Sequence, residues 1–100
     1  MKRLRFDAAA RLELMHEIQY YGATRPGTGI KFQAAMQVAL DRIERHPVSG
    51  RPDEADCRRM RIKGFPFSVV YREESSEIII YAVRPDAREP GYWIDRIRRR

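Results

Sequence analysis

The chain has 100 residues, 43% of them hydrophobic, and a formal net charge of +6 at pH 7. A chain of this length holds one small domain with one core, so residues 1–100 are expected to form a single domain. The longest apolar run, residues 78–83, is far shorter than the roughly 20 residues that cross a bilayer, so no membrane contact is expected. The basic excess is mostly arginine and favours an acidic partner, either nucleic acid or a carboxylate-rich protein surface.

The N-terminal segment is basic but lacks the apolar stretch of a signal peptide, which favours a cytoplasmic location. Cys57 is the only cysteine, so no intramolecular disulfide and no cysteine-based metal cluster can form. No acidic or cysteine spacing around His16 or His46 matches a metal site, and no cofactor-binding motif occurs. We therefore expect neither a metal nor a cofactor.

The first residues predict a strand followed by a helix. Residues 2–6 alternate polar and apolar side chains, as in a strand with one buried face. Asp7 is a suitable N-cap for a helix from residue 8 to about residue 21. Spacings of three to four residues predict that its apolar positions are Leu12, Met15 and Ile18 or Gln19.

A second helix is predicted after a glycine-rich turn, with Thr28 as its expected cap. It must end near His46 because Pro47 follows. Two helices joined by a short turn should pack as an antiparallel hairpin. The apolar face of the second helix follows the helical period closely and consists of Phe32, Ala35, Met36, Ala39, Leu40 and Ile43.

The second half of the chain changes from a helical to an alternating hydrophobic period, which predicts strands. Residues 59–63 alternate, and residues 67–72 and 77–84 are dense in β-branched and aromatic side chains. They predict an antiparallel β-meander, followed by a short helix within residues 89–100. The order predicts an α+β domain with the helical hairpin on one face of an antiparallel sheet.

The first strand of the meander would carry a row of basic side chains. Like charges side by side cost energy unless an anionic partner lies opposite. The row therefore predicts a docking surface for an acidic protein segment or a nucleic acid backbone; the alternative is a solvated face that discourages aggregation. Its members are Arg58, Arg59, Arg61 and Lys63.

Ribonuclease chemistry needs a proton acceptor for the 2′-hydroxyl and a cation or acid near the leaving oxygen. Tyr71 and Tyr81 lie in apolar strands, where a packing role is the simpler interpretation. The β half contains no histidine. The remaining residues of a suitable chemical type are Tyr92, Arg61, Arg84 and Arg88.

Three motifs follow one another along the chain: His46-Pro47 with Gly50 and Arg58-Arg59, then PF-x-V-x-YR at residues 66–72, then AV-x-x-x-x-R-x-P-x-YW-x-x-R at residues 82–96. In this order and spacing, they resemble the ParE branch of the RelE/ParE superfamily, the toxins of type II toxin–antitoxin systems. The resemblance covers essentially the whole chain. It implies a compact α+β toxin that inhibits growth and is neutralised by an antitoxin folded over it.

The resemblance implies one of two targets, because ParE-like members poison DNA gyrase whereas RelE-like members cut mRNA on the ribosome. Ser68 stands where many ribonuclease members have an arginine, and Pro85 where related members often have a histidine. We therefore expect a gyrase inhibitor that acts by binding and has no catalytic residues. The alternatives are a degenerate toxin, or a ribosome-dependent endoribonuclease that uses Arg61, Arg88 and Tyr92.

The resemblance also implies where partners bind. A helix and a strand of the cognate antitoxin are expected in the groove beside the two helices, with acidic side chains against the basic row Arg58, Arg59, Arg61 and Lys63. Operator DNA is expected only through the complex with the antitoxin. The target is expected to contact four residues of the closing motif: Arg88, Tyr92, Trp93 and Arg96. The aromatic pair Tyr92 and Trp93 could also anchor the last helix to the sheet.

Overall fold

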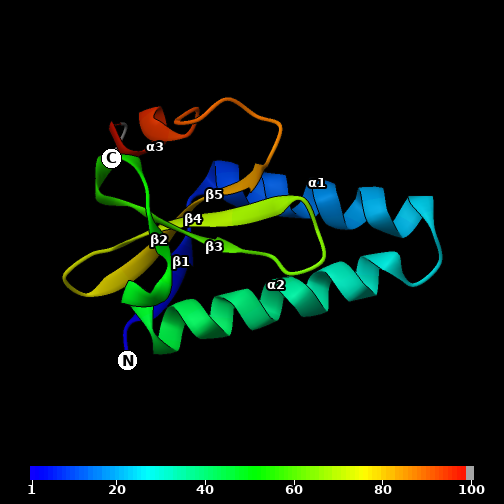
Figure 1. The fold of residues 1–100 in the computed structure, drawn as a ribbon, viewed down its shortest axis with the longest axis horizontal. Helices are drawn as coiled ribbons and strands as arrows, with labels where there is room; N and C mark the ends of the chain where they lie inside the picture. Colours follow the sequence, from blue (N-terminus) through cyan, green and yellow to red (C-terminus); the bar gives the residue numbers. More distant parts are fainter. Residues whose placement is uncertain (99–100) are drawn as a thin grey trace.

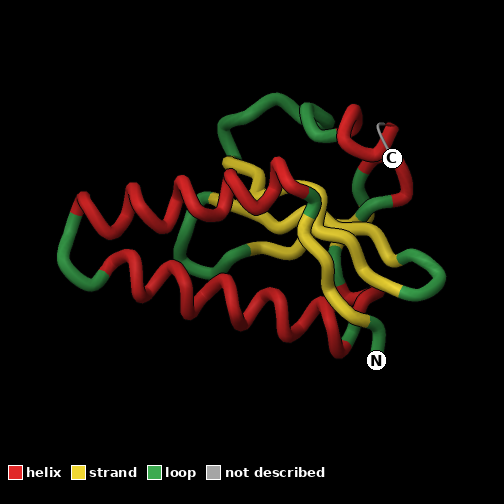
Figure 2. The backbone as a smooth tube through the Cα atoms, turned by 180° about the vertical axis from the view of Figure 1, so that it is seen from behind, coloured by secondary structure: helices red, strands yellow, loops and turns green. Residues whose placement is uncertain are grey.

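A five-stranded sheet carries a helical hairpin on one face and the C-terminal segment on the other in the computed structural model of the chain, which describes residues 1–98 (Figures 1 and 2). Arg99 and Arg100, the end of the expected C-terminal helix segment, lie outside the described residues. The elements in chain order, with η for a 3₁₀ turn, are β1 (Arg3–Phe6), α1 (Ala8–Thr24), α2 (Thr28–Arg45), η1 (Pro47–Ser49), β2 (Arg51–Pro52), η2 (Glu54–Asp56), β3 (Arg58–Arg61), β4 (Phe67–Glu73), β5 (Glu77–Pro85) and α3 (Ile94–Arg98).

The strand order is β1-β5-β4-β3-β2, and the predicted α+β fold with its β-meander is confirmed. β3, β4 and β5 pair antiparallel, but β1 pairs parallel with β5, with Leu4 opposite Ile78. The sheet is therefore mixed and not wholly antiparallel as expected. A tight turn forces the strands that it joins to run antiparallel, and no such turn connects β1 to its partner.

The helical hairpin agrees closely with its predicted bounds. Asp7 caps α1, since its carboxylate accepts a hydrogen bond of 3.0 Å from the Ala9 amide. Gly27, with φ of +82°, is the cap of α2, so Thr28 is the first helical residue and not the cap. None of the helices within residues 1–98 combines the length and apolar character needed to span a membrane.

The main core lies between the hairpin and the sheet. The predicted face of α2 points into it, with Phe32 and Ile43 fully buried. The predicted face of α1 is wrong in part, because Leu12 is 69% and Met15 50% exposed. The side chains of α1 that do meet this core are Ala10, Leu14, Ile18 and Tyr21.

A second, smaller core lies on the opposite face of the sheet, under the C-terminal segment. Trp93 is fully buried there, packed with residues that alternate with those of the main core along β4 and β5. These two strands are apolar on both faces, as strands with two covered faces require. The C-terminal segment covers this face with Trp93, which packs on Cys57, Val70, Ile79, Tyr81 and Ala82.

A candidate anion and partner site beside β3

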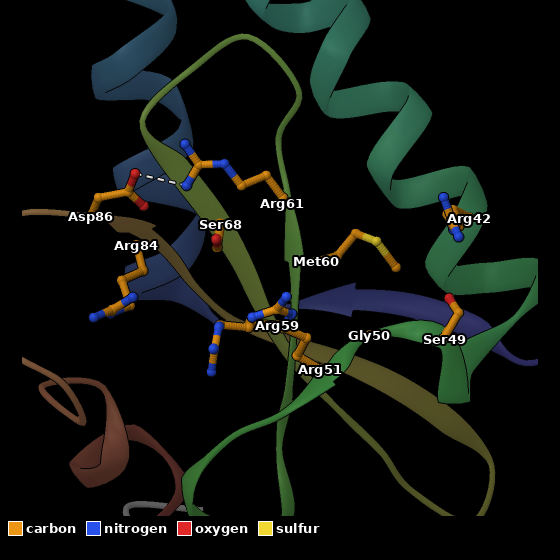
Figure 3. A pocket seen from close by; sticks show the side chains of 10 residues that line it. All are labelled: Arg42, Ser49, Gly50, Arg51, Arg59, Met60, Arg61, Ser68, Arg84 and Asp86. Atoms are coloured by element: carbon orange, nitrogen blue, oxygen red, sulfur yellow. Dashed lines mark hydrogen bonds and ion pairs between the residues drawn. The ribbon is translucent and has the colours of Figure 1, made fainter.

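A cavity of about 510 Å³ opens beside β3 and is bordered by arginines from α2, β2, β3 and β5 (Figure 3). We call it the arginine cavity. Ser49, Gly50, Met60, Ser68 and Asp86 complete its lining. The arginines that border it are Arg42, Arg51, Arg59, Arg61 and Arg84.

Strand register explains why these side chains converge. Ser68 on β4 lies opposite Arg61 on β3 and opposite Arg84 on β5, so the three form one row across the sheet. Residues directly opposite each other in an antiparallel pair share a face. Arg51 on β2 lies opposite Arg59 in the same way. Four arginines therefore point to the face that the helical hairpin leaves uncovered.

Acidic neighbours neutralise only part of this charge. Arg61 donates a hydrogen bond of 2.7 Å to Asp86, and Arg59 lies 3.6 Å from the Asp53 carboxylate. Within residues 1–98, Arg42 and Arg51 form no ion pair with any carboxylate. The hydrogen bond to Asp86 uses one N–H of Arg61, so the remaining donors of the guanidinium can bind an external anion.

The structure keeps only part of the predicted basic row on one face of the sheet. Arg59 and Arg61 share the uncovered face, as the alternation predicted, and Lys63 is exposed just beyond the end of β3. Arg58 points to the other face, where its guanidinium donates a hydrogen bond of 2.9 Å to the Gly50 carbonyl. The structure thus brings Arg59 and Arg61 together and separates Arg58 from them.

An apolar groove of about 290 Å³ runs between α2 and β3, next to Arg61 and Lys63. β2 pairs only with Arg58 and Arg59, so in the described part of the chain no strand covers the outer edge of β3 beyond Arg59. The backbone of an unpaired edge can accept a further strand. The groove and the free edge lie side by side, and the apolar lining consists of Ala35, Val38, Ala39 and Met60.

The closing motif is held by a single carboxylate on α1. Tyr92 donates a hydrogen bond of 2.8 Å to Glu13, and the Arg96 guanidinium donates two, of 2.9 and 2.8 Å, to the same carboxylate. Arg96 also donates to the Tyr81 carbonyl at 2.8 Å. Together with the buried Trp93, these contacts fasten the C-terminal segment to α1 and β5.

The three residues expected in a ribonuclease do not meet in the arginine cavity. Only Arg61 lines it, whereas Arg88 stacks on the Tyr92 ring, with 3.8 Å between the guanidinium carbon and the ring centroid. Burial, and then the hydrogen bond to Glu13, raise the pKa of Tyr92 above its ordinary value. A tyrosine in this state keeps its proton and is a poor general base.

Sequence reasoning missed three residues of these sites: Glu13, Arg42 and Arg51. Arg42 and Arg51 belong to different elements from the basic row, and only the folded chain brings them to one cavity. Glu13 sits among helix-forming residues with no motif around it. Only Arg51 could have been found from the sequence, because it lies between Gly50 and Arg58-Arg59 of the first motif.

Comparison with known proteins agrees with this geometry. No curated protein sequence matches the chain significantly. A solved structure titled "Chromosomal ParDE TA system from P. aeruginosa" shares the fold, with a TM-score of 0.75 and 21% identity, covering 85% of this chain and 96% of that chain. The family model described as the ParE toxin of the type II toxin–antitoxin system parDE matches residues 4–90. The chain therefore belongs to the ParE family of type II toxins.

Proposed function

We propose that this toxin inhibits DNA gyrase by binding to it and that a cognate antitoxin holds it inactive. The observation that carries the proposal is the engagement of two candidate proton acceptors, Tyr92 and Asp86. Tyr92 is bonded to Glu13 with a raised pKa, and Asp86, the carboxylate lining the arginine cavity, is paired with Arg61. General-base cleavage of RNA needs a free acceptor near the bound phosphate. The geometry therefore favours binding over catalysis.

We place the antitoxin at the free edge of β3. An extended segment that adds to this edge would direct alternate side chains into the apolar groove beside α2. Acidic side chains on the segment would meet Arg61 and Lys63 on its rim, with Arg59 nearby on the same face as Arg61. Arg58, bonded to Gly50, would act indirectly by holding the loop before β2. Membership of a toxin–antitoxin family implies such a partner.

We propose that the C-terminal segment presents the contact with gyrase. Of the four residues predicted to contact the target, Arg88 is the exposed one, and its guanidinium lies over the Tyr92 ring. Tyr92, Trp93 and Arg96 would then position the segment instead of touching the target, since each is bonded or buried internally. The toxin would act in the cytoplasm, and operator DNA would be reached through the antitoxin complex.

The test of the target uses the purified full chain in two assays, gyrase supercoiling and ribosome-dependent translation. We expect supercoiling to stop while transcripts stay intact, and Arg88→Ala to weaken the inhibition. Loss of translation with cleaved mRNA and unaffected supercoiling would instead establish the ribonuclease. In that case Tyr92→Phe or Arg61→Ala should abolish the cleavage. An effect in neither assay, with no growth defect on expression, would identify a degenerate toxin.

The antitoxin site is tested by the double variant Arg61→Ala/Lys63→Ala. We expect both the affinity for the antitoxin and its salt dependence to fall, because two rim charges are removed. The control is Arg25→Ala/Lys31→Ala, which removes the same charge at the far end of the helical hairpin, where both side chains are exposed. Equal losses in the two variants would show that net charge, and not the edge of β3, governs binding.

A further inference from the structure

Beyond the proposed function, we infer that the arginine cavity binds the phosphodiester backbone of a single-stranded nucleic acid directly, without cutting it. Guanidinium groups form planar, bidentate hydrogen bonds with phosphate oxygens. The five arginines come from four elements and border one cavity, with Arg42 on α2 at one side and Arg84 on β5 at the other (Figure 3). A cavity bordered by charges of one sign concentrates positive potential there.

Ser68 adds an available hydrogen-bond donor to the lining of the cavity. Its side chain is 5% exposed and lines the cavity floor between Arg61 and Arg84. Its hydroxyl makes no hydrogen bond to any other residue of the described chain. Within residues 1–98 the one buried side-chain polar atom without a partner is the Trp93 indole nitrogen, so the Ser68 hydroxyl still reaches solvent. A phosphate oxygen held by the flanking arginines could accept a hydrogen bond from this hydroxyl.

The shape and lining of the cavity decide which form of nucleic acid fits. A volume of about 510 Å³ is typical of sites that enclose one small ligand, so it suits a short piece of a flexible strand more than a rigid duplex. The lining contains no aromatic ring on which a base could stack. Recognition would therefore rest on the backbone, with little dependence on base sequence and a strong dependence on salt.

An acidic protein segment explains the cavity less well. A segment added to the edge of β3 would meet Arg61 and Lys63, but Arg84 lies on β5, two strands further into the sheet. Such a segment would leave Arg84 without an anionic partner. The antitoxin and the nucleic acid would share Arg59 and Arg61, so the two partners would compete for the toxin.

The cavity can bind a phosphodiester without cleaving it. Asp86 is the carboxylate in its lining, and it is engaged by a hydrogen bond from Arg61. Tyr92 lies outside the lining and donates its proton to Glu13. The arginines can hold a phosphate, but no group there is placed to remove a proton from a 2′-hydroxyl. Bound RNA should remain intact.

The experiment measures fluorescence anisotropy of labelled oligouridylate, oligothymidylate and a DNA duplex with the antitoxin-free full chain over a range of salt concentrations. The test variant is Arg51→Ala/Arg84→Ala, since neither residue borders the apolar groove proposed for the antitoxin. We expect its affinity for both single strands to fall about tenfold or more. The slope of log affinity against log salt should fall by about 0.7 for each phosphate that the variant no longer neutralises.

The charge-matched control, Arg25→Ala/Lys31→Ala, should retain most of the binding. Equal losses in the two double variants would overturn the inference, as would tighter binding of the duplex or cleavage of the oligouridylate. If the double variant proves unstable, the test is repeated with Arg51→Gln alone, because Arg51 is exposed and its replacement should not affect folding. A preference between oligouridylate and oligothymidylate identifies RNA or DNA as the source of the phosphodiester.

Gyrase, antitoxin and oligonucleotide assays on the same protein distinguish this inference from the proposed function. A chain that inhibits gyrase and binds its antitoxin, but binds no oligonucleotide, refutes the inference and leaves the proposed function standing. A chain that binds single strands without affecting gyrase gives the opposite result. Binding of polyglutamate but of no oligonucleotide would assign the cavity to an acidic protein segment.

Discussion

Tyr92 donates a hydrogen bond of 2.8 Å to Glu13, a residue 79 positions earlier in the chain. The same carboxylate accepts hydrogen bonds from Arg96 and, at 2.9 Å, from the backbone amide of Val83. One side chain of α1 thus joins the C-terminal segment to β5. Because it accepts hydrogen bonds from three residues in a partly buried setting, its removal would loosen both connections at once.

Glu13→Gln tests this connection. The substitution leaves the Arg96 guanidinium, which is largely buried, without its counter-charge. We expect the free energy of unfolding to fall by about 1.5–3 kcal/mol, the range for hydrogen bonds to charged groups. Urea denaturation measures the change. Glu89→Gln, which removes an exposed ion pair with Arg88, is the matched control and should change the stability little.

Tyr71 and Gly50 form a second connection, between the sheet and the loop before β2. The buried Tyr71 hydroxyl donates to the Pro47 carbonyl at 2.6 Å and accepts from the Gly50 amide at 3.1 Å. We expect Tyr71→Phe to reduce the free energy of unfolding by about 1–3 kcal/mol, because two backbone groups would be left without their partner. Tyr20→Phe, at an exposed tyrosine, should have little effect.

Gly50→Ala should destabilise for a related reason, since a Cβ at this position would overlap the Tyr71 hydroxyl. Removing that hydroxyl relieves the overlap. In a double-mutant cycle, Gly50→Ala should therefore cost less in the Tyr71→Phe background than in the wild type. Additive effects, measured by thermal or urea unfolding, would contradict the proposed overlap.

Cys57 gives a prediction on pH. Burial raises the pKa of its thiol to about 12, with nearby acidic groups adding to the shift and Arg72 opposing it. Only the thiolate reacts with alkylating reagents, so near neutral pH the folded chain should react about a thousandfold more slowly than the urea-unfolded chain. Iodoacetamide labelling followed by mass spectrometry measures both rates. Equal rates would mean that the C-terminal segment does not shield the thiol.

The same shift makes stability depend on alkaline pH. Because the folded-state pKa lies above the ordinary value of 9.0, the Cys57 contribution is fully present below about pH 9. It is lost as the pH rises toward 12. Cys57→Ala should therefore show a shallower loss of stability over this alkaline range than the wild type, as measured by urea unfolding at a series of pH values.

Val38→Lys tests the apolar groove. Val38 is 68% exposed and lines the groove, so a lysine there is tolerated in the free toxin but would be buried by a docked antitoxin segment. We expect the affinity for the antitoxin to fall about tenfold or more, since burying an unpaired charge is costly. Ile30→Lys, 73% exposed on the same helix but outside the groove, is the control. The two variants should unfold at similar temperatures.

The sequence predicts the buried face of the second helix well and that of the first helix only in part, for one physical reason. The apolar residues of α2 occupy a single face, so the period alone identifies the side that packs on the sheet. In α1, apolar side chains surround the helix, and Leu12 and Ile18 fit the same spacing although only Ile18 meets the core. Tertiary contact with β5 and α2 chooses the buried side.

The alternation along β3 predicts that Arg59 and Arg61 share a face, and the structure places both at the arginine cavity. The rest of the cavity depends on which strands become neighbours. Arg84 reaches it through β5 and Arg51 through a two-residue strand that no sequence pattern indicates. The pairing of Glu13 with Arg96 is equally hard to predict, because the two residues are separated by most of the chain.

The pairing of β1 with β5 sets the order in which the toxin can be assembled during synthesis. Arg3–Phe6 needs Glu77–Ile80 as its partner, and β5 also supplies Arg84 to the cavity and the surface under Trp93. A growing chain whose β5 has not yet left the ribosome therefore carries a helical hairpin with no complete sheet to cover its apolar side. Contacts so distant along the chain form slowly. The complete sheet thus forms late and cooperatively, and a fragment lacking β5 would leave the apolar side of the hairpin uncovered.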